Sequence, residues 1–337
     1  MYECERGYVV MLNKHSDEAK KIDVTKGRDH GREVQSGYYA RKRKSNIKNE
    51  LGQTFFEVIV LVVFIIIFVF PFINLIAVSL SSSRAILSGE VYFLPVEPQL
   101  DTWQTVFKNK ELIDSFVFTV FLTALYTVLA LVFIMLAAYP LSKKTLKGRV
   151  QVLGFFMIPM YFSGGLIPSY LLYRDLNLID SFWVLVLPGL FSTYNMLILK
   201  SFFQQIPDSL EESAKLDGAN DFQILFSIYI PLSLPALATL ALFFAVSRWN
   251  SFSDAIFFLP TRNDLVPLQL LLQRMLNVTV DTELMMRKLD GTTRRVRILK
   301  ESQKAANILF TIVPIILVYP WLQRYFVKGV TLGSIKG

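Results

Sequence analysis

The stretch that decides the fold is residues 207–235, which read PDSLEESAKLDGANDFQILFSIYIPLSLP and place a short polar segment between strongly apolar ones. Pro207 and Gly218 stand where a helix would begin and end. A helix of roughly two to three turns is not stable alone in water, so it requires a partner surface. Two pairs have the spacing of a capping box in its first turn: Asp208 with Glu211, and Ser209 with Glu212.

One face of this predicted helix suits contact with another protein. Leu210 and Ala214 share that face because they lie one helical turn apart. Ser213 and Ala214 are small enough to let a second protein approach closely. A connector lying on a membrane surface would also use a short polar helix. The spacing of the surrounding residues distinguishes such a connector from a helix that contacts another protein.

That spacing resembles the EAA loop of ABC importer permeases, which reads E-A-A, three residues, Gly, nine residues, then I-x-L-P. Here Glu212, Ser213 and Ala214 are followed by three residues, Gly218, nine residues and the sequence IYIP at 228–231. Ser213 and Ile230 depart from the pattern, and both changes are mild.

The resemblance continues in four further stretches: SGGLIPSYLL at 163–172, RWNSF at 248–252, VPLQLLL at 266–272 and QRYFVKGVTLGSIKG at 323–337. These are similar to carbohydrate importers of the MalG-like branch, and within it to the YtcP and LplC type that takes up oligosaccharides and polysaccharide fragments. The resemblance covers about residues 55–337. It implies an all-α, polytopic membrane protein with six transmembrane helices and the type I ABC importer permease fold.

Two regions follow from this reading: a cytoplasmic tail at 1–50 and a transmembrane domain at 51–337. The domain contains the EAA coupling loop, 207–235, and an outer loop, 248–304. The tail mixes twelve Lys or Arg with eight Asp or Glu and has few apolar residues, which favours a disordered or weakly helical segment. Its basic end could contact anionic lipid, or simply orient the first span.

Composition independently indicates a membrane protein. Hydrophobic residues make up 53% of the chain and charged residues only 18%, below the quarter or so that is usual in soluble proteins. The apolar residues form six blocks, each near the roughly twenty residues that span a bilayer. These blocks are 58–78, 115–138, 150–173, 181–199, 222–247 and 305–322.

The distribution of Lys and Arg orients the predicted spans. Basic residues precede the first block, join the second to the third, lie in the coupling loop and follow the sixth block, which predicts that both termini are cytoplasmic. The segment 281–304 is also basic but faces outward in this scheme. Long loops cross the membrane largely regardless of charge, so the orientation stands. The protein is expected in the plasma membrane as a multi-pass protein.

The source of energy is predicted to lie outside the chain. None of the six blocks contains Asp, Glu, Lys, Arg or His, the groups that mark proton relays and ion sites. The phosphate-loop pattern G-x-x-x-x-G-K-[ST] is also absent from the sequence. A self-contained secondary sugar carrier, which could bind sodium through backbone carbonyls, is the alternative from another class. An ABC importer for another polar solute is the alternative within the same mechanism.

The family resemblance implies the partners: a second homologous permease, two ATPase subunits that bind ATP and Mg, an extracytoplasmic substrate-binding protein and membrane lipid. No cofactor, metal or nucleic acid is expected on this chain. The coupling role falls on residues of the EAA-like loop: Glu211, Glu212, Ser213, Ala214, Asp217, Gly218, Ala219 and Pro231.

Catalysis by the chain itself is not predicted. His15 and His30 lie in the charged tail, and Cys4 is the only cysteine. A membrane glycosyltransferase would need carboxylates at the membrane surface. Asp175 and Asp180 stand in a short outer turn, where capping of the adjoining segments is the simpler reading.

Sugar selectivity is predicted to come from aromatic and polar groups within an apolar pathway, because aromatic rings stack on sugars while amides and hydroxyls bind their hydroxyl groups. Interfacial aromatic belts and helix packing would explain the same residue types without any substrate. The candidates are Tyr161, Ser163, Tyr194, Asn195, Trp249, Asn250 and Ser251.

The outer segment 260–280 predicts an amphipathic helix, with Leu268, Leu271, Leu272 and Met275 at helical spacing. The resemblance implies that the outer loop meets the binding protein, with Gln269, Gln273 and Arg274 as docking candidates. The basic stretch that follows is read as a docking surface, a bias toward acidic sugars, or a solvated insertion.

Overall fold

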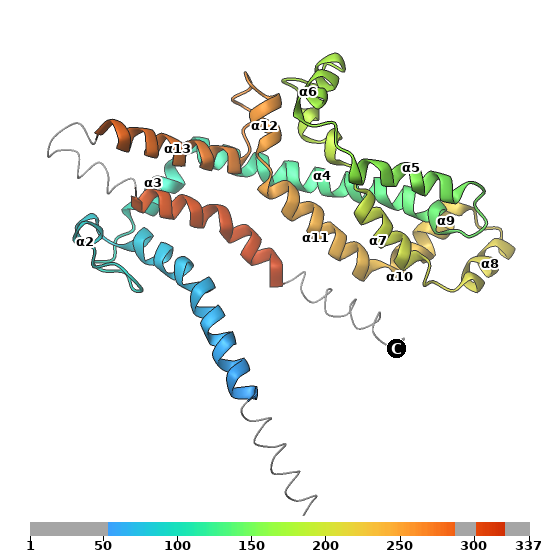
Figure 1. The fold of residues 1–337 in the computed structure, drawn as a ribbon, viewed down its shortest axis with the longest axis horizontal. Coiled ribbons are helices and arrows are strands. Elements are labelled where there is room, and N and C mark those ends of the chain that lie inside the picture. Colours follow the sequence, from blue (N-terminus) through green and yellow to red (C-terminus); the bar gives the residue numbers. More distant parts are fainter. Residues whose placement is uncertain (1–52, 287–300, 321–337) are drawn as a thin grey trace, which may run out of the picture. The chain divides into compact units, whose positions relative to one another are not determined.

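The computed structural model describes residues 53–286 and 301–320. Within these ranges the chain forms helices and turns and contains no strand (Figure 1). It divides into two compact units that meet between Phe72 and Ile73, inside the helix Gln53–Leu80. The tail at 1–50, the basic stretch at 287–300 and the end of the chain from 321 lie outside the described residues.

The second unit contains the named helices in the following order. They are α2 (Ser83–Ser88), α3 (Asp101–Lys108), α4 (Lys110–Ser142), α5 (Arg149–Tyr161), α6 (Leu166–Asp175), the 3-10 turns η1 (Phe182–Leu185) and η2 (Leu187–Gly189), α7 (Thr193–Phe203), α8 (Asp208–Leu216), α9 (Asp221–Ile224), the π-helical turn η3 (Leu225–Tyr229), α10 (Ile230–Leu232), α11 (Leu234–Asn250), α12 (Ser253–Phe258) and α13 (Leu268–Met286). The helix Glu301–Pro320 follows.

Among residues 53–286 and 301–320, three helices are long and apolar enough to cross a membrane: Gln53–Leu80, α4 and Glu301–Pro320. Three bent pairs pass the same test together, namely α5 with α6, η1–η2 with α7, and the segment Asp221–Leu232 with α11. Counting each pair as one span gives six, and these six coincide with the six apolar blocks of the sequence.

The bends have local causes in the sequence. The α5–α6 pair turns through 116° at residues that include Gly165, whose φ of 84° is accessible to glycine but strained for other residues. Pro231 and Pro235 flank the 84° bend before α11, and neither can donate a backbone hydrogen bond to a continuous helix.

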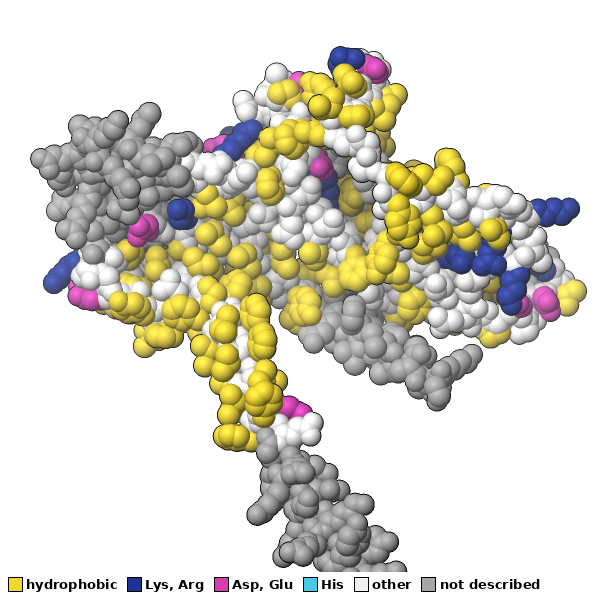
Figure 2. Space-filling view, viewed as in Figure 1, with side chains coloured by type: hydrophobic (Ala, Val, Ile, Leu, Met, Phe, Trp, Pro, Cys, Tyr) yellow, Lys and Arg dark blue, Asp and Glu magenta, His cyan; other side chains and the backbone are white. Residues whose placement is uncertain are grey.

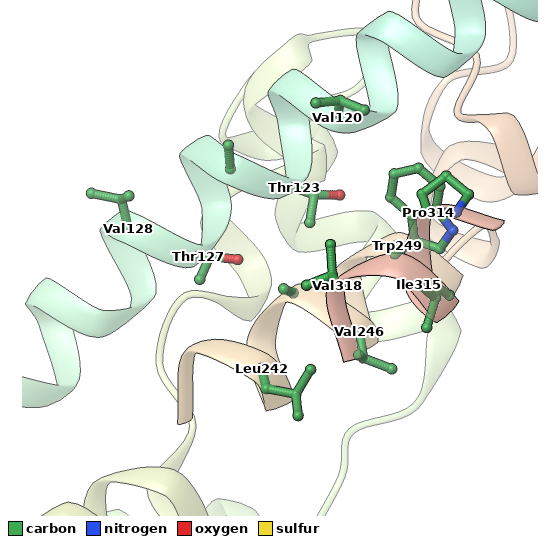
Figure 3. Close-up of a pocket in the computed structure, with 12 residues that line it drawn as sticks. Val120, Thr123, Thr127, Val128, Leu242, Val246, Trp249, Pro314, Ile315 and Val318 are labelled. Atoms are coloured by element: carbon green, nitrogen blue, oxygen red, sulfur yellow. The ribbon is translucent and has the colours of Figure 1, made fainter. Parts of the chain in front are cut away.

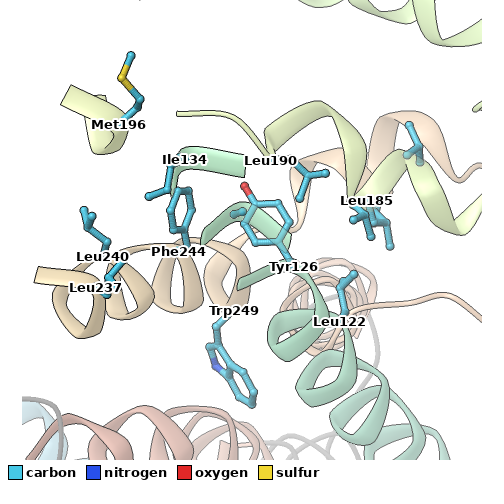
Figure 4. Packing of buried hydrophobic residues seen from close by; sticks show 14 of the residues in the cluster. Leu122, Tyr126, Ile134, Leu185, Leu190, Met196, Leu237, Leu240, Phe244 and Trp249 are labelled. Atoms are coloured by element: carbon cyan, nitrogen blue, oxygen red, sulfur yellow. The ribbon is translucent and has the colours of Figure 1, made fainter. Parts of the chain in front are cut away.

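The core is built on one face of α4, which packs against α7, α11 and α13. Its buried residues recur every three or four positions along the helix, and Leu122, Tyr126 and Ile134 lie in the cluster shown in Figure 4. Val117 and Val128 on other faces remain exposed. Figure 2 likewise shows hydrophobic side chains along the outside of helix Gln53–Leu80, a surface suited to lipid.

The fifth helical span extends slightly beyond the approximate limits predicted from the sequence. The fifth block was limited to 222–247 and held no ionisable residue, but α11 continues to Asn250 and buries Arg248 in its last turn. The block ended where hydropathy fell, whereas the helix ended three residues later. An ionisable group therefore does lie near the end of a span. The argument against a proton-coupled or ion-coupled carrier can no longer rest on a complete absence of such groups.

Candidate coupling site and transport pathway

Helix α8 is the short polar helix predicted from the sequence, but its first turn is not closed by a capping box. Pro207 occupies the N-cap position, and no side chain there accepts a hydrogen bond from the helix. Asp208 and Glu211 still place negative charge near the helix N-terminus, where the dipole favours it. A capping box forms instead at the start of α9, where Asn220 and Gln223 exchange hydrogen bonds.

The end of α8 confirms the prediction for Gly218. This residue has φ 84°, the left-handed conformation that ends many helices. Its N–H donates to the carbonyl of Lys215, and the N–H of Ala219 donates to the carbonyl of Ala214. These are the two bonds of a Schellman motif, so the helix has a defined end on which the following residues turn back toward the spans.

The carboxylate of Glu211 is the centre of a polar cluster that ties α8 to two spans. One oxygen pairs with the ammonium of Lys143, which directly follows α4, and accepts a 2.8 Å hydrogen bond from the Tyr229 hydroxyl. The other accepts a 2.8 Å bond from Lys215, one turn along α8. Lys143 also donates to the Tyr229 hydroxyl at 2.7 Å. Glu211 is only 8% exposed, so these bonds form largely out of water.

Aromatic rings enclose the Lys143 end of the cluster. The ammonium lies 4.3 Å from the centre of the Tyr139 ring and 4.0 Å from that of Tyr229, within range of cation–π attraction. The two rings meet edge to face at 5.1 Å, and Phe203 of α7 packs on Tyr229 in the same manner at 5.4 Å. This packing fixes the positions of the groups that hold Glu211.

The electrostatics keep Glu211 ionised. Burial raises the pKa of this carboxyl, but hydrogen bonds from Lys143, Lys215 and Tyr229 outweigh burial and lower the pKa to about 2. A carboxylate held by so many donors is a structural anchor rather than a group free to meet another protein.

The remaining coupling candidates divide by exposure. Glu212, Ser213, Asp217 and Gly218 are exposed, and Leu210 and Leu216 add exposed apolar surface to the same helix. Ala214 and Ala219 are half-buried against the core, and Pro231 is exposed at the far end of the loop. Sequence reasoning grouped Glu211 with the exposed residues and missed Tyr139, Lys143 and Tyr229. Lys143 was counted only as an orientation signal, and no local pattern links it to Glu211, 68 positions away.

The predicted pathway residues do not form one site. Tyr161 and Ser163 are exposed at the break between α5 and α6, and Tyr194 is exposed on α7. Asn195 is buried in the first turn of α7, where its N–H donates to the Ser192 cap.

Trp249 and Asn250 end α11 and contact residues other than these four. Trp249 is buried and donates to the carbonyl of Thr311 at 3.3 Å. Asn250 is exposed; it donates to the carbonyl of Val246 and accepts from Gln269 at 3.3 Å. Ser251 donates to Asp254 at 3.2 Å. For Trp249, the structure therefore supports a packing role in this conformation.

A cavity of about 390 Å³ lies between α4, α11 and the helix Glu301–Pro320 (Figure 3). Its walls are apolar except for the hydroxyls of Thr123 and Thr127, which are buried and have no hydrogen-bond partner in the part of the chain that the structure describes. Trp249, Pro314 and Val318 line the opposite side. Because sugars need many polar partners, this cavity alone does not make a sugar site.

A second polar cluster surrounds Arg248 in the last turn of α11, and sequence reasoning missed it. One terminal nitrogen donates to the carbonyl of Leu185 and to the carboxylate of Asp254, both at 2.8 Å. The guanidinium lies 5.7 Å from the centre of the Tyr126 ring, whose hydroxyl donates to the carbonyl of Gly189. The cluster thus joins α4, η1, α11 and α12.

Helix α13 confirms the predicted amphipathic pattern. Leu268 and Leu271 are buried, Leu272 and Met275 are half-buried, and the N–H of Leu268 donates to the Thr119 hydroxyl on α4 at 2.8 Å. Of the docking candidates, Arg274 is exposed, whereas Gln269 and Gln273 are half-buried.

The carboxylates considered for an enzymatic site serve local structure instead. Asp175 pairs with Arg174, and Asp180 accepts from the N–H of Thr261 at 3.1 Å. Within the described ranges, no group of three or more His, Cys, Asp or Glu is arranged to hold a metal ion.

Up to six apolar spans, a charge-anchored polar helix between two of them and ionisable groups confined to span ends define a polytopic membrane permease. The chain belongs to the family described as the binding-protein-dependent transport system inner membrane component, which it matches over residues 37–332. The resemblance read from the EAA-like loop is thereby confirmed.

Individual relatives agree with this assignment. The chain is 39% identical over 279 residues to the polygalacturonan/rhamnogalacturonan transport system permease protein YtcP of Bacillus subtilis, covering 82% of this chain and 96% of that protein. It is 38% identical over 272 residues to protein LplC of the same organism, covering 80% and 90%. A crystal structure of a bacterial ABC transporter involved in the import of the acidic polysaccharide alginate matches with a TM-score of 0.73 and 33% identity, over 81% of this chain and 96% of that one.

The protein is therefore a transport permease subunit and not an enzyme: it is a multi-pass inner-membrane component of a binding-protein-dependent ABC importer. The all-α permease fold predicted from the sequence is likewise confirmed.

Proposed function

We propose that this chain translocates an oligosaccharide, delivered by an extracytoplasmic binding protein, in a complex with a second homologous permease and two ATPase subunits. ATP and Mg bind to the ATPases, and both termini of this chain are cytoplasmic. Support for the substrate class comes from the relatives, since YtcP is described as a polygalacturonan/rhamnogalacturonan permease and the structural neighbour as an alginate importer. Alginate is described there as an acidic polysaccharide.

The single observation that carries the coupling role is the division of α8 into two faces. Glu211 faces inward and is held by Lys143 and Tyr229, while Glu212 and Ser213 face outward and are free to meet an ATPase. A force applied to the outer face is passed to α4 through Lys143 and toward α11 through Tyr229. The coupling helix therefore moves together with the spans that line the proposed pathway.

The outer face of the protein is proposed to receive the binding protein through α13. Its apolar side is anchored on α4, so Arg274 and the neighbouring Gln273 are presented by a fixed helix. Four residues remain candidates for the pathway. Tyr161, Ser163 and Tyr194 are exposed near helix breaks, and Asn250 neighbours the Arg248 cluster.

The test is a double substitution on the outer face of α8, Glu212→Ala with Gly218→Leu, in the whole complex. We expect less ATPase subunit to be retained on the purified permease and less oligosaccharide uptake into vesicles, while the two permeases still pair. Glu90→Ala is the matched control. Glu90 is also exposed, but it lies between the first span and α4, on the side of the membrane opposite the proposed cytoplasmic N-terminus. Normal retention and uptake in the double variant would remove the coupling role. Uptake by this chain alone, without an ATPase, would instead establish a secondary carrier.

A further inference from the structure

Arg248 is a buried cation with an unused binding edge. It is 6% exposed, and the contacts to Leu185 and Asp254 both use one terminal nitrogen, Nη1. The other two nitrogens, Nε and Nη2, are buried and have no hydrogen-bond partner among residues 53–286 and 301–320. Buried charged donors without partners are costly, and in a membrane span they usually mark a functional site.

The geometry of the free edge selects its ligand. The guanidinium is planar, and the N–H groups of Nε and Nη2 project in parallel from the same edge. That edge matches the two oxygens of a carboxylate, which accept two parallel charge-assisted hydrogen bonds. A hydroxyl of a neutral sugar offers one uncharged oxygen to the two donors, so its hydrogen bonds to this edge are weaker than those of a carboxylate.

The surroundings hold this edge in place. Asp254 fixes Nη1, and the Tyr126 ring lies 5.7 Å from the guanidinium carbon. Tyr126 is itself anchored to the carbonyl of Gly189. Arg248 thus enters binding with its side chain already ordered, which lowers the entropic cost of taking a ligand.

We propose that Arg248 is a specificity-determining residue that binds the carboxylate of a sugar acid as it passes through the permease. The inference rests on the proposed function and narrows its substrate to acidic oligosaccharides. In the conformation described here Arg248 is buried, so the carboxylate reaches the free edge in another conformation of the transport cycle, in which this edge is open.

Asp254 sets the strength of this contact. Its carboxylate shares the guanidinium with the substrate carboxylate, and the two negative charges repel each other. Binding is therefore weak enough for release on the other side. Removing the Asp254 charge should tighten binding of an acidic sugar, whereas a purely structural Arg248–Asp254 pair predicts only damage from the same change.

The experiment measures binding to the whole detergent-purified complex without its binding protein, so that only the permease discriminates. The probes are trigalacturonate and the same trimer with every carboxyl methyl-esterified, each titrated by saturation-transfer NMR. We expect the wild-type complex to prefer the acid by about tenfold to hundredfold, the range for hydrogen bonds to a charged group. Arg248→Gln should abolish this preference and leave the affinity for the ester unchanged, and Asp254→Asn should increase it.

Arg262→Gln is the control, since Arg262 pairs with Asp264 in an exposed site and its loss should leave the preference intact. Arg248→Lys keeps the charge without the two-pronged edge, so it should assemble normally and lose most of the preference. A full preference in Arg248→Lys or Arg248→Gln would overturn the inference, as would an equal loss of both probes in an assembled variant. A wild-type complex that binds the ester as tightly as the acid would overturn the inference but not the proposed function. Failure to bind either probe would overturn the proposed substrate class as well.

Discussion

The inward face of α8 gives a prediction whose size follows from the structure. The pKa of Glu211 falls from 4.5 to about 2, and because Lys215 on α8 itself supplies part of this shift, the shift corresponds to at most about 3 kcal/mol of stabilisation of the docked helix. The loss of one partner from a buried ion pair costs a similar amount, roughly 3–5 kcal/mol. Glu211→Gln should therefore weaken the docking of α8 by about 3 kcal/mol, which is roughly a hundredfold in the protection of its amides from hydrogen exchange.

A double-mutant cycle isolates the pair. Lys143→Met and Glu211→Gln should each destabilise α8, and the two together should cost less than the sum by at least about 1.5 kcal/mol, because the double variant leaves no buried charge unpaired. The matched control is Arg262→Met with Asp264→Asn, an ion pair whose side chains are 43% and 62% exposed. Its coupling should be much smaller, because exposed ion pairs are screened by solvent. Additive losses at Lys143 and Glu211 would refute the anchor.

The same carboxylate predicts a pH dependence of defined sign. Because the pKa of Glu211 is lower in the folded protein than its usual value of 4.5, its contribution is fully present above pH 4.5 and is lost as the pH falls through about 2. The exchange protection of α8, corrected for intrinsic rates, should be constant from pH 8 to 5 and fall below pH 4.5. In Glu211→Gln this fall should be absent, and an identical profile in both proteins would contradict the assignment.

Three further predictions follow from single positions. Gly218→Ala and Gly218→Leu should destabilise α8 equally, by about 1 kcal/mol, because the cost lies in the positive φ and an added Cβ meets no atom within 4 Å. Only assays with the ATPase present should separate the two variants, and unequal hydrogen exchange of α8 in the isolated permease would count against this reasoning. Gly189→Ala should cost about 1–3 kcal/mol in thermal unfolding, since its Cβ would lie 2.6 Å from the Tyr126 hydroxyl oxygen; Tyr126→Phe should relieve part of that cost, and purely additive losses would argue otherwise. Cys4, the only cysteine, should react with a membrane-impermeant maleimide in inverted vesicles but not in intact cells; labelling in intact cells would reverse the proposed orientation.

The spans and the polar helix could be predicted from the sequence because both depend on residues that lie close together in the chain. Apolar blocks predict spans by length, and the interval from Pro207 to Gly218 predicts α8 with its C-terminal glycine. The bends were not predicted, although Gly164, Gly165 and the prolines that cause them were visible. Their residue types permit a break, but only packing against neighbouring helices decides whether the span continues through it.

The contacts that make the candidate sites were out of reach for a different reason. Glu211 meets Lys143 and Tyr229 across 68 and 18 positions, and Arg248 meets Leu185 across 63. No periodicity connects such positions in a single sequence. The capping-box prediction failed because Pro207 occupies the N-cap and Glu211 pairs instead with Lys143, far away in the sequence, and with Lys215, one turn along α8.

Lys143 and Arg248 show how a charge at the end of a span is to be interpreted. Arg248 stands immediately beyond a predicted apolar block and Lys143 five positions beyond another, where a basic residue is normally read as an interfacial anchor or an orientation signal. An anchor of that kind extends its charge into water, whereas these two charges turn inward and are met by Glu211 and Asp254. A basic side chain turns inward instead of extending into water where an acidic residue lies on an adjoining element. The ammonium of Lys143 is paired with Glu211 and hydrogen-bonded to Tyr229. This arrangement suits a contact that transmits motion from α8 to the spans. At Arg248 two donors remain unpaired, which suits a site that awaits a ligand.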